Sequence, residues 1–373
     1  MKIVHVSDTH LGFSAYRKVD DETGINQREM DVYRRFAEFA DKAIEADPDV
    51  VIHSGDLFDS VRPSNRAISV ALDNLARITA AGIPVVVIAG NHSTPRLRET
   101  GSVFKIMEHV RGLRAVYSGA YERVVQDDLT IHAIPHNEGE ALFTELDKVR
   151  PDSDANYNVE TLHAGVSGLN VFKMGEFNET IVPSSYLRPD MDYIALGHYH
   201  NHSSAADNAY YAGSIERLSF SEADEAKGFV VIDLDTKKRK FVKLAAREMM
   251  DLGPIDASGM DAASLMEEIS NVLDTVSMEA RIVRLIVNRV PSSLYKSIDF
   301  HRIVQKASAA VHFEPKFEVI QENSSVQWKN ASIDSLESEY SSFLDQYPVE
   351  RVSKDDVRAK GLEYLKRGLE GSN

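Results

Sequence analysis

The feature that most constrains the fold is a regular alternation of short β-branched runs with longer amphipathic segments over the first 235 residues. The segments Val32–Glu45 and Arg66–Ala80 show helical periodicity, and the helix-ending residues Pro48 and Gly82 follow them. The runs rich in valine and isoleucine predict strands at Ile3–Val6, Val50–Ile52, Val85–Ile88, Thr130–Ile134, Tyr193–Leu196 and Phe229–Leu234. Alternation of this kind predicts an α/β domain in which helices are layered on a sheet.

The pattern changes after about residue 245. Helical periodicity at Met260–Leu273 and Leu294–Ala307 alternates with strand-like runs at Arg281–Val290 and Lys316–Gln321. We therefore expect a second, smaller α+β domain. Beyond residue 331, apolar residues recur at helical spacing, and a capping pattern at Ser353 begins a further helix. The tail is thus expected to form two amphipathic helices, which pack on their own domain or dock on a partner.

Composition excludes several classes of protein. The 373 residues contain no cysteine, so disulfides and thiolate metal sites are excluded. The formal charge of −16 excludes a uniformly basic coat for nucleic acid, so an anionic ligand must be attracted by a local field. The longest apolar stretches, such as Ile83–Ala89, are far shorter than the roughly 20 residues of a membrane span. We expect a cytoplasmic protein that does not bind membranes.

Polar clusters follow five of the strand-like runs. Because loops at the carboxyl ends of parallel strands converge, we expect these clusters to form one site. Side chains two positions apart on a strand point the same way, so Asp8 and His10 can face this site together. The clusters are Asp8-Thr9-His10, Gly55-Asp56, Gly90-Asn91-His92, His163-Ala164-Gly165 and Gly197-His198-Tyr199-His200.

The chemistry of these residues indicates a metal centre. Two carboxylates, one carboxamide and four histidines are ligands that suit Mn²⁺, Fe²⁺ or Zn²⁺. Seven ligands are too many for one ion but suffice for two if a carboxylate bridges. Two divalent ions and two aspartates leave a charge of about +2, which attracts a phosphate and favours phosphoester hydrolysis. Each cluster alone is typical of a turn or a core histidine. The ordered combination of all five clusters, each after a strand, is much more specific for a metal centre.

These motifs resemble the binuclear metallophosphoesterase (calcineurin-like) superfamily, and within it the Mre11/SbcD nucleases of DNA double-strand break repair. The resemblance covers roughly residues 1–235. It is carried by His5–Gly12, His53–Phe58 with Arg62-Pro63, Ala89–His92, Ala195–His198, Tyr211–Ser214 and Lys227–Phe229. It implies a four-layered α/β sandwich metallophosphoesterase (nuclease) domain over residues 1–244. A smaller α+β capping and DNA-binding domain would span 245–328, and a C-terminal helix pair that binds an ATPase partner would span 329–373.

The resemblance also assigns the metal ligands. It implies two Mn²⁺ ions per subunit, and Fe²⁺ and Zn²⁺ stay open as alternatives. One ion would be held by Asp8, His10, Asp56 and His200, and the other by Asp56, Asn91, His163 and His198, with Asp56 bridging. His92 would act near the scissile phosphate as a proton donor or transition-state stabiliser.

Asp59 departs from the pattern of some Mre11 members, which have a histidine three residues after the bridging aspartate. Phosphoprotein phosphatases of the same superfamily use an aspartate at this spacing to orient the catalytic histidine. We hypothesise that the Asp59 carboxylate accepts a hydrogen bond from His92 and favours its protonated form. The alternative is a solvated turn carboxylate.

The resemblance further implies a Mn²⁺-dependent nuclease, with 3′–5′ exonuclease and single-strand endonuclease activity, which processes breaks together with the Rad50 ATPase. Candidate DNA contacts near the site are Arg62, Arg66, Arg96, Arg98 and Lys173. A homodimer would form through the helix after Pro63 and the segment Val103–Val110; the alternative is that both pack within the chain. The tail residues expected to bind the ATPase are Ile333, Leu336, Tyr340, Phe343, Leu344, Val357, Leu362 and Leu365.

Two other functions stay open on the sequence alone. A small-substrate phosphodiesterase or phosphomonoesterase would use the same metal ligands, although the extra domain and tail favour a macromolecular substrate. A non-catalytic scaffold on the same fold is the second alternative, and the presence of every expected ligand and of His92 argues against it.

Overall fold

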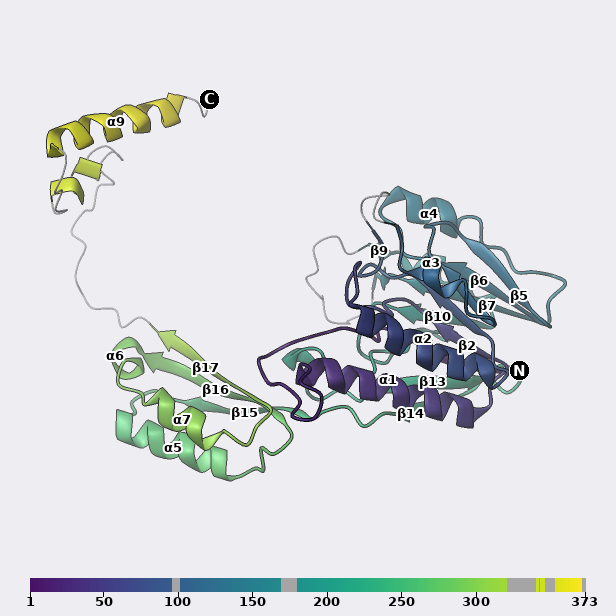
Figure 1. The fold of residues 1–373 in the computed structure, drawn as a ribbon, viewed down its shortest axis with the longest axis horizontal. Helices are drawn as coiled ribbons and strands as arrows, with labels where there is room; N and C mark the ends of the chain where they lie inside the picture. Colours follow the sequence, from purple (N-terminus) through teal and green to yellow (C-terminus); the bar gives the residue numbers. More distant parts are fainter. Residues whose placement is uncertain (96–100, 169–179, 321–339, 342, 346–352, 371–373) are drawn as a thin grey trace. The chain divides into compact units, whose positions relative to one another are not determined.

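The computed structural model describes residues 1–95, 101–168, 180–320, 340–341, 343–345 and 353–370. Met1–Ile320 form one compact unit and Gln321–Asn373 form another, so the two are described separately. Within the first unit, two six-stranded sheets and a three-stranded sheet carry most of the strands (Figure 1). The expected domain boundary at residue 245 falls inside this unit and stays a prediction.

The first six-stranded sheet has the strand order β14-β13-β1-β2-β3-β4. Its strands β1 to β4 run parallel, and β13 is antiparallel to β1. The bounds are β1 Lys2–Val6, β2 Val50–His53, β3 Val85–Ile88, β4 Leu113–Val116, β13 Gly228–Asp233 and β14 Lys238–Lys243. Helices α1 (Gln27–Ala46), α2 (Asn65–Ala80) and α3 (Phe104–Met107) share an apolar cluster with this sheet.

Helix α1 begins five residues before the expected start at Val32, and its N-cap explains the difference. The Asn26 side chain accepts hydrogen bonds from the backbone N–H groups of Arg28 and Glu29. This satisfies donors that have no partner within the helix. The apolar periodicity does not reach this polar first turn. Asp47, in a left-handed conformation, ends the helix one residue before Pro48.

The second six-stranded sheet has the order β11-β12-β10-β7-β6-β5. Its bounds are β5 Glu122–Gln126, β6 Leu129–Ile134, β7 Tyr157–His163, β10 Tyr193–Gly197, β11 Ser203–Ala206 and β12 Ala209–Tyr211. An apolar layer that includes Ile52 and Val86 from one sheet and Ile131 and Val159 from the other lies between the two sheets. Helix α4 (Glu140–Leu146) covers the outer face of the second sheet through Leu142 and Leu146. The chain thus forms the expected four-layered α/β sandwich (Figure 1).

Residues 249–320 form a parallel three-stranded sheet with its own core. The strands are β15 Met249–Asp256, β16 Ile282–Pro291 and β17 His312–Ile320, and the helices are α5 Ala262–Asp274, α6 Ser292–Tyr295 and α7 Phe300–Lys306. The single helix expected over Leu294–Ala307 is two short helices, because the Asp299 side chain caps a new helix at the backbone N–H of Arg302. Tyr16 stacks on His312 and so joins this part to the sandwich.

In the second unit, helix α9 spans Lys354–Glu370 and begins directly after Ser353, as the capping pattern predicted. The hydroxyl of Tyr340 donates a hydrogen bond of 3.0 Å to the backbone oxygen of Val357, and Leu344 is buried. Across the described part of the chain, no helix has the length and apolar character to span a membrane.

One carboxyl group in the sandwich is buried without a hydrogen-bond partner among the described residues. Glu160 lies on β7 between Val159 and Thr161, whose side chains face the other sheet, so Glu160 points to the outer face. Its side chain is 1% exposed, and neither carboxylate oxygen has a hydrogen-bond partner among the described residues. Burial raises the pKa of Glu160 to about 8.

We expect this group to make stability depend on pH. Because the folded state holds the Glu160 proton more tightly than the unfolded state, the free energy of unfolding falls as the pH rises from about 5 to about 8. In Glu160→Gln this contribution disappears, so the variant gains about 2 to 4 kcal/mol relative to wild type over that range. Urea denaturation at both ends of the range measures this, with Glu140→Gln on exposed α4 as the control. Parallel pH profiles for wild type and Glu160→Gln would contradict it.

Candidate metal centre

The site lies where five parallel strands end. Strands β1, β2 and β3 of the first sheet lead into three of the polar clusters, and β7 and β10 of the second sheet lead into the other two. The structure brings the seven candidate ligands together at these strand ends. They are Asp8, His10, Asp56, Asn91, His163, His198 and His200, and all except Asn91 are buried.

One group of ligand atoms comes from Asp8, His10 and His200. Their candidate ligand atoms all lie within 4.8 Å of one another. The Nε2 atoms of His10 and His200 face each other at 3.1 Å, and the two rings meet at an angle of 70°. Two imidazole nitrogens at this separation compete for one proton, which is the arrangement expected where both lone pairs point toward a shared cation.

The second group is built around His163. Its Nε2 lies 3.1 Å from Oδ2 of Asp56 and 2.9 Å from Oδ1 of Asn91. The ring of His198 packs edge-on against His163, and the backbone N–H of His198 donates to the Asp8 carboxylate. Asp8 also lies within 4.8 Å of the Asp56 and His163 ligand atoms, so it belongs to both groups. The bridging role assigned to Asp56 stays a prediction.

The donor set fits divalent cations. Every converging atom is a nitrogen or an oxygen, and two carboxylates, Asp8 and Asp56, are buried close together. Burial opposes charge on His163, yet Asp56 and Asp8 raise the pKa of its imidazole to about 9. Burial likewise opposes charge on Asp56, but His163 and His10 hold its pKa well below the usual range. The buried site therefore stabilises a negative charge on Asp56 together with a positive charge on His163.

The ligand loops have strained backbones. Asp8 has a φ of 51°, His10 of 45°, Asp56 of 51° and His198 of 113°. Such conformations cost on the order of 1 kcal/mol or more each and persist only where the surroundings hold them. Here the backbone N–H of Asp8 donates to the oxygen of Gly55, and that of His10 donates to the oxygen of Asp56. Hydrogen bonds between the loops thus fix the direction of the ligands.

Two glycines in the motifs are required by close approach. A Cβ atom on Gly90 would lie 2.2 Å from Oδ1 of Asp56, and one on Gly55 would lie 2.2 Å from Nδ1 of His163. Because these neighbours are the candidate ligands themselves, a side chain at either position would displace them. The glycines of the Gly55-Asp56 and Gly90-Asn91 pairs therefore serve the site rather than a turn alone.

A buried support behind His200 was not predicted from the sequence. Glu222 accepts a hydrogen bond of 3.1 Å from Nδ1 of His200, and its other oxygen pairs with Lys227 at 2.5 Å. The Lys227 ammonium also donates to the backbone oxygen of His200. Burial opposes charge on Glu222, but His200 and Lys227 lower its pKa to about 2. With Nδ1 held as a donor, His200 presents Nε2 to the site.

The structure corrects the expected contact between Asp59 and His92. Nδ1 of His92 lies 3.0 Å from the backbone oxygen of Asp59, whereas the Asp59 carboxylate lies 3.2 Å from Nδ1 of His10. The backbone turn at Asp59 brings its carbonyl, not its carboxylate, to His92. The Asp59 side chain is 32% exposed, and it orients a candidate metal ligand. The backbone N–H of His92 donates to Oδ1 of Asp56.

His136 is a further residue at the site that the sequence did not reveal. It follows β6, its backbone N–H donates to the oxygen of Ala89, and burial lowers its pKa to about 4. Because His136 is a single histidine after Pro135, no motif spacing identifies it as part of the site.

The other predicted residues fall in three places. Arg62 and Arg66 are exposed, and Arg66 pairs with Glu29 at 3.2 Å. Tyr340, Phe343, Leu344, Val357 and Leu362 lie in the second unit, as does the backbone of Leu365 on α9. Outside the described residues lie Arg96, Arg98, Lys173, Ile333 and Leu336.

The same part of the chain is similar to known proteins. A family model described as "Calcineurin-like phosphoesterase" matches residues 1–202. A Methanococcus maripaludis protein named "DNA double-strand break repair protein Mre11" is 32% identical over 249 residues, which cover 63% of each chain. The alignment therefore spans less than two thirds of that relative. A protein of the same name from Archaeoglobus fulgidus is 26% identical over 89% of this chain and 77% of its own length. A solved structure from Thermus thermophilus covers 65% of this chain and 98% of its own, with 12% identity and a TM-score of 0.40.

We expect the support behind His200 to control metal affinity. Glu222→Gln keeps the shape of the side chain but removes the charge that holds the Nδ1 proton, so Mn²⁺ affinity should fall about 10- to 100-fold. Isothermal titration of the metal-free protein measures this. Glu225→Gln is the matched control, because Glu225 pairs with the ammonium of the same lysine, Lys227, at 2.7 Å. Equal affinities for wild type and Glu222→Gln would contradict the assigned role.

Proposed function

The chain belongs to the calcineurin-like phosphoesterase family, and from this membership we propose that it is a two-metal DNA nuclease that processes double-strand breaks. The observation that carries the proposal is the convergence of seven nitrogen- and oxygen-bearing side chains where strands of both sheets end, with His92 beside them. The names of the similar Mre11 proteins support DNA repair as the setting. Family membership itself indicates a phosphoester hydrolase.

We propose two Mn²⁺ ions as the cofactors. One would be held by Asp8, His10, Asp56 and His200, and the other by Asp56, Asn91, His163 and His198. Divalent ions bound in such a pair polarise a phosphate, activate a water and stabilise both oxygens of an in-line displacement. The buried donors exclude bulk water and lie on loops that hydrogen bonds hold in place.

His92 is the proposed proton donor. A carbonyl oxygen only accepts hydrogen bonds, so Nδ1 of His92 carries a proton where it meets the backbone of Asp59. Nε2 is then the atom that gives a proton to the leaving oxygen, and it does so from the imidazolium form. The hydrogen bond from the His92 backbone to Asp56 ties the position of this ring to a metal ligand.

Binding of DNA rests on local positive charge in an acidic chain. We propose Arg62 and Arg66 as phosphate contacts, with Arg96, Arg98 and Lys173 as further candidates. The domain that we predict over residues 245–328 would cap the substrate. Homodimerisation would use α2 and the Val103–Val110 segment, where the side chain of Ile106 is 45% exposed.

A small-substrate phosphodiesterase on the same residues is the second candidate. The metal chemistry is shared, so the sandwich alone does not separate the two. The additional three-stranded sheet and the second unit favour a macromolecular substrate. A comparison of turnover on linear DNA and on a chromogenic phosphodiester distinguishes them. Hydrolysis of the small ester with DNA left intact would favour this candidate.

The division of labour between His92 and the ligands can be tested directly. His92→Gln removes the proton donor but leaves all seven candidate ligands, so the variant should keep both ions and lose about 10²- to 10⁴-fold in turnover. Metal analysis and a nuclease assay on the same preparations provide the readouts. Nuclease activity at the wild-type level, with the ions retained, would overturn the role of His92.

The second unit is proposed to bind a Rad50-type ATPase through an apolar helix face. Phe343 is 60% exposed there, although Leu344 beside it is buried. Deletion of residues 331–373 should abolish association with the ATPase and leave Mn²⁺-dependent hydrolysis of a simple phosphodiester unchanged, because the site lies within Met1–Ile320. Co-purification measures the first effect. Undiminished association after the deletion would refute the assignment.

A further inference from the structure

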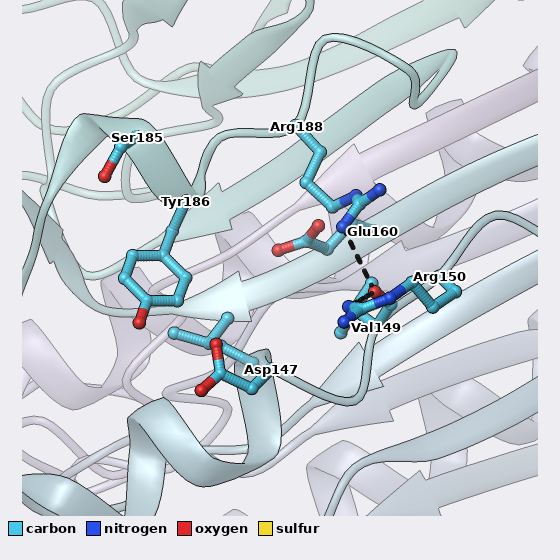
Figure 2. A pocket seen from close by; sticks show the side chains of 8 residues that line it. Asp147, Val149, Arg150, Glu160, Ser185, Tyr186 and Arg188 are labelled. Carbon is cyan, nitrogen blue, oxygen red and sulfur yellow. Dashed lines mark hydrogen bonds between the residues drawn. The ribbon is translucent and has the colours of Figure 1, made fainter.

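A pocket lies on the outer face of the second sheet, away from the metal centre. It has a volume of about 250 Å³ and lies between the end of α4 and the short helix η2 (Ser184–Tyr186) (Figure 2). Residues of β7 face it from the side opposite to those that face the first sheet. None of the groups in the proposed catalytic mechanism lines this pocket.

Among the residues that line the pocket is Glu160, whose carboxyl group is buried. Figure 2 shows this carboxyl group directed toward the space beside Tyr186. Both of its oxygens lack a hydrogen-bond partner among the described residues, although the side chain is almost fully buried. An unpaired buried carboxyl is costly, and a ligand that donates hydrogen bonds to it would remove that cost.

Two guanidinium groups lie beside this carboxyl. Arg188 donates to Asp190 through Nε and Nη2, and its Nη1 lies 3.3 Å from the backbone oxygen of Val149. Arg150 donates to the same oxygen. The Asp147 carboxylate also lines the pocket, and Asp190 pairs with Arg188, so the positive and negative charges nearly balance and favour neither a cation nor an anion. The pocket therefore suits a neutral molecule that presents donors to Glu160 and acceptors to the arginines.

We propose that this pocket binds a guanine base. Guanine carries two parallel donors, N1–H and the N2 amino group, which match the two oxygens of one carboxylate. Its O6 acceptor lies next to N1–H and N7 lies beyond O6, and these two acceptors are the atoms that arginine recognises on guanine. Tyr186 lines the pocket, so its ring can contact the base. Adenine lacks the N1–H donor, so the pocket should discriminate between the two purines.

The protonation state of Glu160 should also make guanine binding depend on pH. Two hydrogen bonds from guanine require the ionised carboxylate, whereas the empty pocket holds this group with a pKa of about 8. Binding therefore releases a proton, and the affinity should rise about 25-fold between pH 6.5 and pH 8.5, as the ionised fraction of a carboxyl group with a pKa of about 8 rises. A ligand that accepts a hydrogen bond from the protonated carboxyl would show the opposite trend.

The test is a titration of the full chain with guanosine in the presence of a chelator, so that its outcome does not depend on the proposed nuclease activity. We expect guanosine to bind, adenosine to bind at least about tenfold more weakly, and Glu160→Gln to lose about tenfold in guanosine affinity together with the pH dependence. Glu140→Gln, on the exposed surface of α4, is the matched control. Arg188→Lys, which keeps the charge, should weaken guanosine binding and spare the fold.

The source of the base is distinguished by competition. Displacement of guanosine by a single-stranded oligonucleotide with one guanine would identify a base presented by a nucleic acid strand. Displacement by free guanine nucleotides alone would identify a soluble ligand, and either result supports the pocket. Equal affinity for adenosine, preferential binding of a free amino acid, or no guanosine binding at about 1 mM would overturn the proposal.

Discussion

The site depends on hydrogen bonds between the loops that follow neighbouring strands. The backbone N–H groups of Asp8 and His10 donate to the loop that contains Gly55 and Asp56, and Leu11 continues the same pairing to Leu57. These bonds extend the register of β1 and β2 beyond the sheet and hold several ligands in left-handed conformations. The loops would otherwise relax to ordinary turns, and the carboxylates and imidazoles would not converge. The apolar layer between the sheets brings the ends of β7 and β10 to the same place.

The buried polar groups around this framework serve different purposes. Behind the metal centre, Glu222 and Lys227 compensate each other and orient His200, so their burial is balanced by hydrogen bonds and charge. On the outer face of the second sheet, Glu160 has no hydrogen-bond partner among the described residues, and the charge of Arg188 offsets only part of the cost of its burial. Because Glu222 is paired, its pKa is lowered, whereas the pKa of Glu160, which lacks a hydrogen-bond partner among the described residues, is raised by burial.

Much of this arrangement could be predicted from the sequence because strands and the polar residues after them leave a local signal. The ends of β1, β2, β3 and β10 follow from valine- and isoleucine-rich runs. The start of α1 leaves no such signal, because Asn26 caps a polar turn without apolar periodicity. Glu222 leaves none either, because its contact with His200 is tertiary. Asp59 was predicted near His92, but only the backbone geometry determines that its carbonyl makes this contact. No single-sequence signal identifies Glu160 as buried, since alternation on β7 does not predict what covers each face.

We propose that seven side chains from the two sheets hold a pair of divalent ions. Anomalous diffraction at the manganese absorption edge, from crystals grown with Mn²⁺, measures this most directly. We expect two peaks about 3.5–4 Å apart, one beside His10 and His200 and the other beside Asn91 and His163. A single peak, or peaks away from these side chains, would contradict it.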